Sequence, residues 1–106
     1  MSDLEDLKAV RELLSDPARW TKHVSARDKD GHNTHVRSKT AACFRLSGAV
    51  HKVRNNLPAR ERLLDKISLH IPAGECHIPD YNDETYTTHA DVLALVDRAI
   101  ETEMKL

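Results

Sequence analysis

The stretch from Trp20 to Gly31, WTKHVSARDKDG, decides how the rest of the chain can fold. It holds the single Trp of the sequence and ends in Asp30-Gly31, a pair typical of tight turns between strands. Residues 21–28 before the turn and residues 32–38 after it can each form a short extended segment. The stretch therefore predicts a small antiparallel β-hairpin between helical segments.

Two loop lengths fit this turn, and they sort the side chains differently. A two-residue loop leaves Val24 and Val36 on opposite faces of the hairpin. A three-residue loop over residues 29–31 places Gly31 at the left-handed position that glycine favours, because glycine has no Cβ to clash. It also gathers Val24, Ala26 and Val36 on one face, which can be buried. We therefore expect the three-residue loop, with residue 28 opposite 32 and residue 26 opposite 34.

The composition is that of an ordinary soluble domain. The chain has 106 residues, of which 40% are hydrophobic, 31% charged and 4% aromatic, so we expect a single domain over residues 1–106 with an aliphatic core. A net charge of −1 argues against a dedicated nucleic-acid binder. No apolar run approaches the length of about 18 residues that a membrane span needs. The start MSDLEDLKAV lacks the features of a signal peptide, and two Cys make no disulfide framework. We therefore expect a cytoplasmic protein without nucleic-acid or membrane partners.

Four segments carry helical patterns. The first follows a capping box at residues 2–5 and the last follows one at residues 88–91. The expected helices are residues 3–14, the run AACFRLSGAVHKVR at 41–54, residues 59–70, and a helix that follows Thr88. Residues 72–83 are expected to be the longest irregular stretch. The pattern predicts an α+β fold that is mostly helical, with about four helices and one small antiparallel β-hairpin. We expect the second and last helices to form the core and the hairpin to pack its apolar face on them.

Two residues predict specific contacts inside this fold. Gly48 lies in the middle of a predicted helix, where it costs about 0.5–1 kcal/mol relative to Ala. Its place there predicts the close approach of another backbone. Trp20 is large and mostly apolar, and its indole N–H needs a partner. We interpret it as an anchor between the first helix and the hairpin, with a ring that lines a shallow pocket as the alternative.

A set of short motifs resembles one known family. The motifs are Trp20, Ala26-Arg27-Asp28 with Gly31, Ala42-Cys43, Gly48-Ala49, Asn82-Asp83, and Val92 in the last helix. In their order and spacing they resemble a family of small uncharacterised proteins from bacteria and their phages, over most of the chain. The resemblance implies the layout and assigns no reaction. By analogy alone, it implies a role in host interaction or in countering host defence.

The polar residues of these motifs are the candidate site. We select Arg27, Asp28, Asn82 and Asp83, with Trp20 and His89 beside them. In the functional interpretation, the planar guanidinium of Arg27 holds a carboxylate or phosphate. In the structural interpretation, which we favour, Arg27 bridges the hairpin to an Asn82-Asp83 turn that caps backbone groups before the last helix.

A metal site is not predicted, and neither is a cofactor. His32 and His35 point to opposite faces if they lie on a strand, so they cannot chelate one ion together. Residues 28–31, DKDG, begin like a calcium loop. The glycine of such a loop belongs at the sixth position and a glutamate at the twelfth, and this sequence meets neither requirement.

Two hypotheses for function follow, from different classes. We favour a non-enzymatic binding module, whose surface is the polar face of the hairpin with the loop at 72–84 and whose protein or small-molecule partner is unidentified. The alternative is a small hydrolase of a nucleotide-like or phosphorylated substrate, in which Arg27 holds the anion and Asp83 or His89 is the acid or base. That alternative requires the three side chains to converge on one pocket. An exposed hairpin edge also favours a homodimer.

Overall fold

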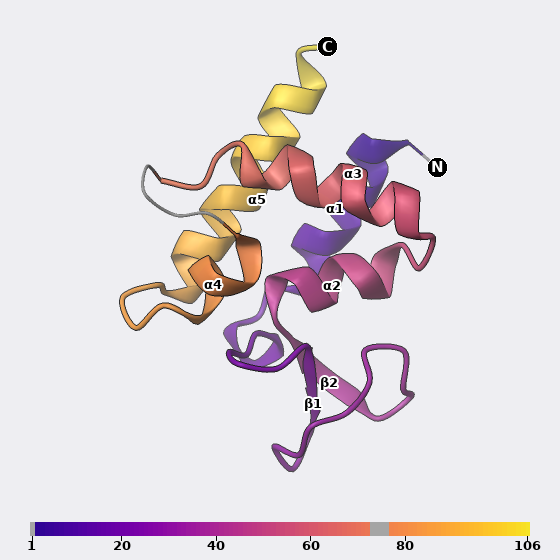
Figure 1. Ribbon diagram of the computed structural model, residues 1–106, viewed down its shortest axis with the longest axis vertical. Coiled ribbons are helices and arrows are strands. Elements are labelled where there is room, and N and C mark those ends of the chain that lie inside the picture. Colours follow the sequence, from indigo (N-terminus) through magenta and orange to yellow (C-terminus); the bar gives the residue numbers. More distant parts are fainter. Residues whose placement is uncertain (1, 73–76) are drawn as a thin grey trace.

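Five α-helices and a two-stranded antiparallel sheet make up the part of the chain that the computed structural model describes, residues 2–72 and 77–106. In chain order the elements are α1 (Asp3–Leu13), the 3-10 helix η1 (Pro17–Arg19), β1 (Ala26–Asp28), β2 (Ala41–Phe44), α2 (Leu46–Val53), α3 (Leu57–Ser68), α4 (Ile78–Asp83) and α5 (His89–Met104). The helices cross one another in one body, and β1 and β2 project from it at one end (Figure 1). The expected class, α+β and mostly helical, is confirmed.

The two predicted capping boxes set the helix starts. Ser2 Oγ accepts the N–H of Glu5 at 3.1 Å at the start of α1. At the start of α5, Thr88 Oγ1 accepts the N–H of Asp91 at 3.2 Å, and the Asp91 carboxylate accepts the N–H of Thr88 at 2.9 Å. Each bond satisfies a backbone donor that a helix start would leave unpaired. Both starts agree with the prediction, and α1 ends one residue earlier than expected.

The core is aliphatic, as the composition predicted, but its centre is α1. Leu7, Val10 and Leu14 are fully buried, and α1 contacts α5, α2 and α3. The expectation that the second and last helices form the core gives α2 too much weight. The reason is that α2 has only eight residues, since the segment before it is a strand.

The second strand of the hairpin is not the one that the sequence predicted. β1 pairs with β2, Ala41–Phe44, which we had assigned to the start of a helix. Extended pairing places Phe44 opposite Ala26, and both side chains are buried in the core. As part of this strand, Phe44 faces inward and is 2% exposed. Burial of the one Phe of the chain therefore outweighs the local helical pattern.

The turn itself has the predicted register. Gly31 has a φ of 87°, and Asp28 N–H bonds to His32 O at 2.9 Å while Thr34 N–H bonds to Ala26 O at 3.1 Å. These bonds correspond to a three-residue loop, and an isolated antiparallel bridge joins residues 27 and 33. The pairing stops there, because the chain turns again at residues 35–38 and buries Val36 in the core. The predicted partner strand over 32–38 is thus reduced to a bridge.

Gly48 confirms its predicted role. A Cβ added to it would lie 2.1 Å from the carbonyl oxygen of Ser25, a separation that real Cβ atoms do not adopt. The bend before β1 therefore lies directly on the backbone of α2. The same Ser25 oxygen accepts the N–H of Arg45 at 3.1 Å, which fixes how the hairpin leaves the helical body.

The stretch predicted to be irregular, residues 72–83, contains a helix. α4 occupies its second half, with Pro79 in the first turn, where a missing N–H costs nothing. Ile78, Tyr81 and Asn82 are buried, so tertiary packing supports this helix although it has only six residues. Residues 73–76, including Cys76, lie outside the described residues.

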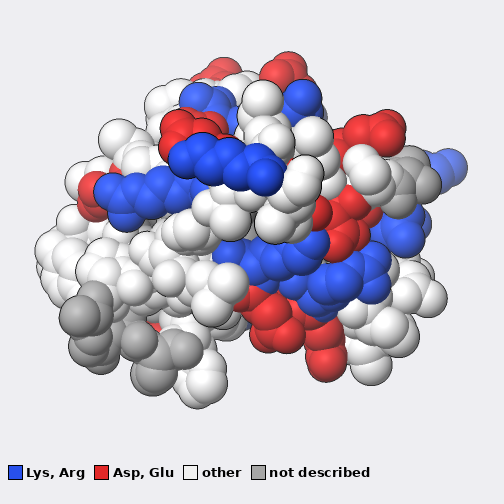
Figure 2. All heavy atoms as spheres, turned by 90° about the horizontal axis from the view of Figure 1, so that it is seen from above, with Lys and Arg blue, Asp and Glu red and all other residues white. Residues whose placement is uncertain are grey.

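Ion pairs join the helices at the end away from the hairpin. Asp3 of α1 pairs with Arg62 and Lys66 of α3 at 2.8 and 2.9 Å, and Lys66 also pairs with Glu103 of α5 at 2.8 Å. Hydrogen bonds from Arg62 and Lys66 hold the pKa of Asp3 well below its usual range. Figure 2 shows side chains of both signs interleaved on this end of the molecule. None of the helices in the described part of the chain is long and apolar enough to cross a membrane.

Candidate functional site

Asn82, near the end of α4, is the centre of the polar contacts between the hairpin and the helices. Its side chain is fully buried. Oδ1 accepts the indole N–H of Trp20 at 2.7 Å and the backbone N–H of Leu46 at 3.0 Å. Nδ2 donates to Thr21 O and to an oxygen of Asp83, each at 3.0 Å. One amide therefore joins the segment before β1, the start of α2 and α4, and all its hydrogen-bonding capacity is used.

Asp83 extends this cluster with an ion pair. One carboxylate oxygen accepts the N–H of His23 at 2.8 Å, and the other lies 3.0 Å from Arg45 Nη1. Partial burial by itself would raise the pKa of Asp83, but the His23 N–H, the Asn82 amide and the Arg45 guanidinium together lower that pKa below its ordinary value. His23 has a φ of 74°, a left-handed conformation that is strained for residues other than glycine. We call Trp20, Arg45, Asn82 and Asp83 the Asn82 clamp.

His89 lies beside the clamp and has its own internal partner. Its ring is 6.0 Å from the ring of Trp20, and its Nε2 is 2.6 Å from the carbonyl oxygen of Leu14. Lys22 Nζ lies over the Trp20 ring, 5.5 Å from its centre. Trp20 therefore joins the segment before β1 to α4 and α5, and His89 joins the start of α5 to the end of α1.

Arg27 does not reach Asn82 or Asp83, contrary to our structural interpretation. Its guanidinium donates to Thr21 Oγ1 at 3.0 Å and to Lys22 O at 3.3 Å on one side. On the other side it donates to Gly31 O at 3.1 Å and Asn33 Oδ1 at 3.3 Å. Arg27 thus ties the segment before β1 to the turn after it, and Arg45 takes the place beside Asp83. Arg45 could not be recognised from the sequence, because residues 41–54 were expected to form one helix.

Asp28 faces away from the clamp and organises the turn. One of its oxygens accepts the N–H groups of Asp30 and His32, at 2.9 and 3.0 Å. These bonds, with that of His32 first, lower the pKa of Asp28. Asp28, Asp30 and His32 hold ligand-type atoms within 4.8 Å of one another and so form the group that could hold a metal ion, as far as the described residues show. Asp30 and His32 are exposed, and one Asp28 oxygen is already used by the turn.

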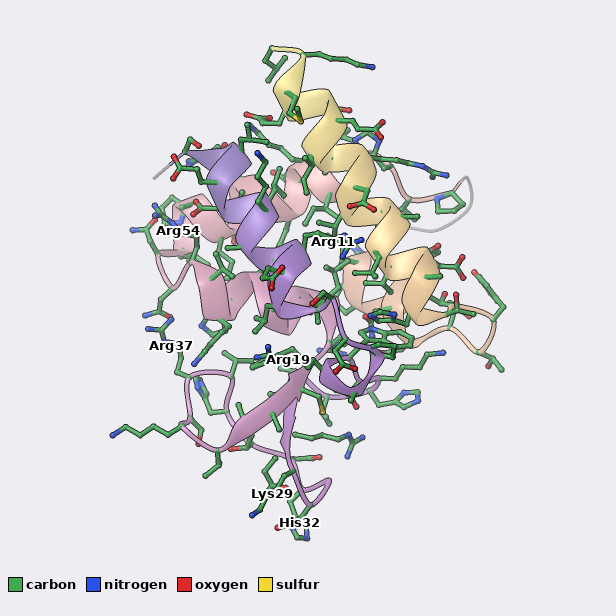
Figure 3. All side chains as sticks on the ribbon, turned by 180° about the vertical axis from the view of Figure 1, so that it is seen from behind. Arg11, Arg19, Lys29, His32, Arg37 and Arg54 are labelled. Atoms are coloured by element: carbon green, nitrogen blue, oxygen red, sulfur yellow. The ribbon has the colours of Figure 1, made fainter. Side chains whose placement is uncertain are left out.

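A hollow of about 460 Å³ lies between this turn and the start of β2. Its lining, which we call the tip hollow, consists of Asp28, Lys29, Asp30, Lys39, Thr40, Ala41 and Ala42. Lys29 and His32 extend from the end of the hairpin, well away from the helices (Figure 3). The volume falls in the range of about 300–1,000 Å³ in which ligand pockets are found. Asp28 is the one predicted site residue in this lining.

A second hollow of about 280 Å³ lies where α2, α3 and α4 meet, lined by Ser47, Leu64, Asp65, Ser68, His77, Ile78 and Pro79. Neither hollow is lined by Arg27, Asp83 or His89. The structure thus brings Trp20, Asn82, Asp83 and His89 together and leaves Arg27 and Asp28 on the hairpin. The three side chains named for a hydrolase each use their polar atoms within the fold.

Comparisons with known proteins give the family and no activity. No curated protein and no solved structure matches the chain. One family model matches residues 1–102, nearly the whole length. The chain therefore belongs to DUF6197, a family of unknown function.

Proposed function

We propose that this protein is a non-enzymatic binding module that holds an extended segment of a partner protein in the tip hollow. The observation that carries the proposal is that three of the four charged side chains lining this hollow are not used by the fold. In the described part of the chain, the side chains of Lys29, Asp30 and Lys39 have no hydrogen bond or ion pair to another residue. The clamp, by contrast, uses its polar groups internally.

The strand beside the hollow favours a polypeptide as the occupant. Within the described residues, β2 has a single strand neighbour, β1. Its other edge is covered at Phe44, whose carbonyl oxygen accepts the N–H of Thr21 at 3.0 Å. Toward the tip, Ala41 and Ala42 line the hollow. Extended peptides commonly bind beside exposed strands, and the small side chains of Ala41 and Ala42 allow a close approach.

The charges define the chemistry of the partner. Two acidic and two basic residues line the hollow, so a segment with charges of both signs is complementary and a strongly acidic or strongly basic one is not. A protein of a phage or of its host is the partner that the sequence resemblance favours. The hydrolase alternative has weaker support, because Arg27, Asp83 and His89 do not share either hollow.

A selection from displayed random peptides tests this proposal. The bait is the full chain, and the test variant is Lys29→Glu/Lys39→Glu. We expect selected peptides to lose at least about tenfold in affinity, since each close charge pair contributes about 1.5 kcal/mol or more when desolvated. The matched control is Lys8→Glu/Lys105→Glu, which makes the same change of net charge on exposed residues of the helical body.

Three results would overturn the proposal. The selection could yield no binding peptides, or its peptides could bind the test variant as tightly as the wild type. Native mass spectrometry could instead show a dimer that the test variant dissociates, and the occupant would then be a second copy of the chain. Loss of binding in the test variant alone, with retained binding in the control, supports the proposal.

A further inference from the structure

The loop between the turn and β2 is held on the helical body by three contacts, two of them with α2. The side chain of Val36 is 2% exposed and belongs to the core. Arg37 Nη1 donates to the carbonyl oxygen of Lys52 at 3.1 Å, in the last turn of α2. The rings of His35 and His51 form a T-shaped contact, with centres 5.7 Å apart and planes at 75°. Figure 3 shows Arg37 on the side of the loop that faces the helices.

Each of the two imidazoles makes one hydrogen bond close to its own backbone. His35 Nδ1 accepts the backbone N–H of Arg37 at 3.0 Å, so this nitrogen must carry no proton. His51 Nε2 lies 3.0 Å from Asn55 Oδ1 and donates to it. A proton added to His51 places a positive charge among Arg37, Arg60 and the ring of His35, which weakens the contact between the loop and α2.

The surroundings of His51 oppose a positive charge. Burial lowers the pKa of His51 below its ordinary value, and the charges of Arg60 on α3 and of His35 and Arg37 in the loop lower it further. The hydrogen bond with Asn55 acts in the opposite direction and is smaller than the effect of burial. Lys52 is the neighbouring cation on α2 itself. The fold therefore favours a neutral His51.

We propose that the contact between His35 and His51 is an acid-sensitive latch, which holds residues 34–38 against α2 while the His51 ring is neutral and loosens when that ring is protonated. A base whose pKa is lower in the folded state binds fewer protons there than when unfolded. The contribution of His51 to holding the loop is therefore fully present above the ordinary histidine pKa of 6.5. It is lost as the pH falls through the pKa of the folded state.

The latch regulates the tip hollow, a consequence that rests on the proposed function. Lys39 and Thr40 line the hollow directly after the latched segment. Ser38 Oγ lies 2.9 Å from Thr40 Oγ1, and Ala41 N–H bonds to Ser38 O at 3.2 Å. Release of residues 34–38 therefore moves one wall of the hollow away from the other. A bound peptide is expected to dissociate at acid pH.

Hydrogen exchange of backbone amides tests the latch without any partner. Between about pH 7.5 and about pH 5.5, the range in which histidines titrate, we expect the protection of the Arg37 and Ser38 amides to fall about tenfold after correction for intrinsic exchange. Amides in α5 should keep their protection. In His35→Gln/His51→Gln the fall should vanish, since glutamine does not titrate. The control His70→Gln, a histidine whose ring lies 3.4 Å from Thr102 Oγ1 at the other end of the molecule, should respond as the wild type.

The possible outcomes separate the two proposals. Equal acid loss of protection in the double variant, or no acid loss in the wild type, overturns the latch. If the latch responds as expected but no selected peptide binds the tip hollow, the latch stands and the proposed function fails. If peptides bind with the same affinity at both pH values, the proposed function stands and regulation by the latch fails.

Discussion

The Asn82 clamp and the tip hollow lie at the two ends of one small hairpin and use polar residues in opposite ways. In the clamp, one buried amide makes four hydrogen bonds and one carboxylate is shared between a backbone N–H and Arg45. At the tip hollow, Lys29 and Lys39 are exposed and extend into solvent. A cluster of polar residues therefore indicates a binding site only when the hydrogen-bonding groups of those residues are not already used by the fold.

The largest effect is expected for Asn82→Ala. The change leaves the Trp20 indole N–H and the Leu46 backbone N–H without their acceptor and the Thr21 carbonyl without its donor. A buried group left unpaired costs about 1–3 kcal/mol, so we expect the free energy of unfolding to fall by about 3–4 kcal/mol. Urea denaturation followed by Trp20 fluorescence measures it.

Asn82→Asp tests the roles of the amide oxygen and the amide nitrogen of Asn82 separately. It keeps an acceptor for Trp20 and Leu46 but removes the donor to Thr21 O and brings a second carboxylate against Asp83. We expect it to destabilise the protein as well, and more at neutral pH than at acid pH. Full stability of either variant would contradict the clamp.

A smaller effect is expected from the titration of Asp83. Its pKa is lower in the fold than the ordinary value of 3.8, so its contribution to stability is complete above that value and is lost as the pH falls through the folded pKa. Asp83→Asn should therefore lower the free energy of unfolding at about pH 7. The difference in free energy of unfolding between the variant and the wild type should be smaller at about pH 3. Urea denaturation at both pH values measures the gap, and a gap that widens in acid would show that Asp83 is not held as a carboxylate.

Local chemistry made part of this fold predictable. The left-handed position of Gly31, the two capping boxes and the close approach at Gly48 all follow from rules that act over a few residues or within one helix. These three predictions were correct because they depend on local chemistry alone. The α+β class followed equally from the spacing of apolar residues along α1, α3 and α5.

Long-range packing decided what the sequence could not show. Residues 41–44 have a helical pattern, yet they form a strand because β1 needs a partner that buries Phe44. Because residues 41–44 form a strand, Arg45 precedes α2 and does not lie inside a helix. Its side chain then lies beside Asp83. Asn82 and Asp83 contact each other as neighbours in the clamp, but which arginine meets Asp83 depends on that strand. The tip hollow joins residues about ten positions apart through the same pairing.

The most direct test of the account compares Arg27→Ala with Lys39→Ala by urea denaturation. We predict that Arg27→Ala lowers the free energy of unfolding by about 1–3 kcal/mol, because four hydrogen bonds within the hairpin are lost. Lys39→Ala should stay within about 0.5 kcal/mol of the wild type, as an exposed side chain without partners does. Unchanged stability of Arg27→Ala would show that its guanidinium is free for a ligand, and would contradict the claim that the motif residues build the fold while binding occurs at the tip.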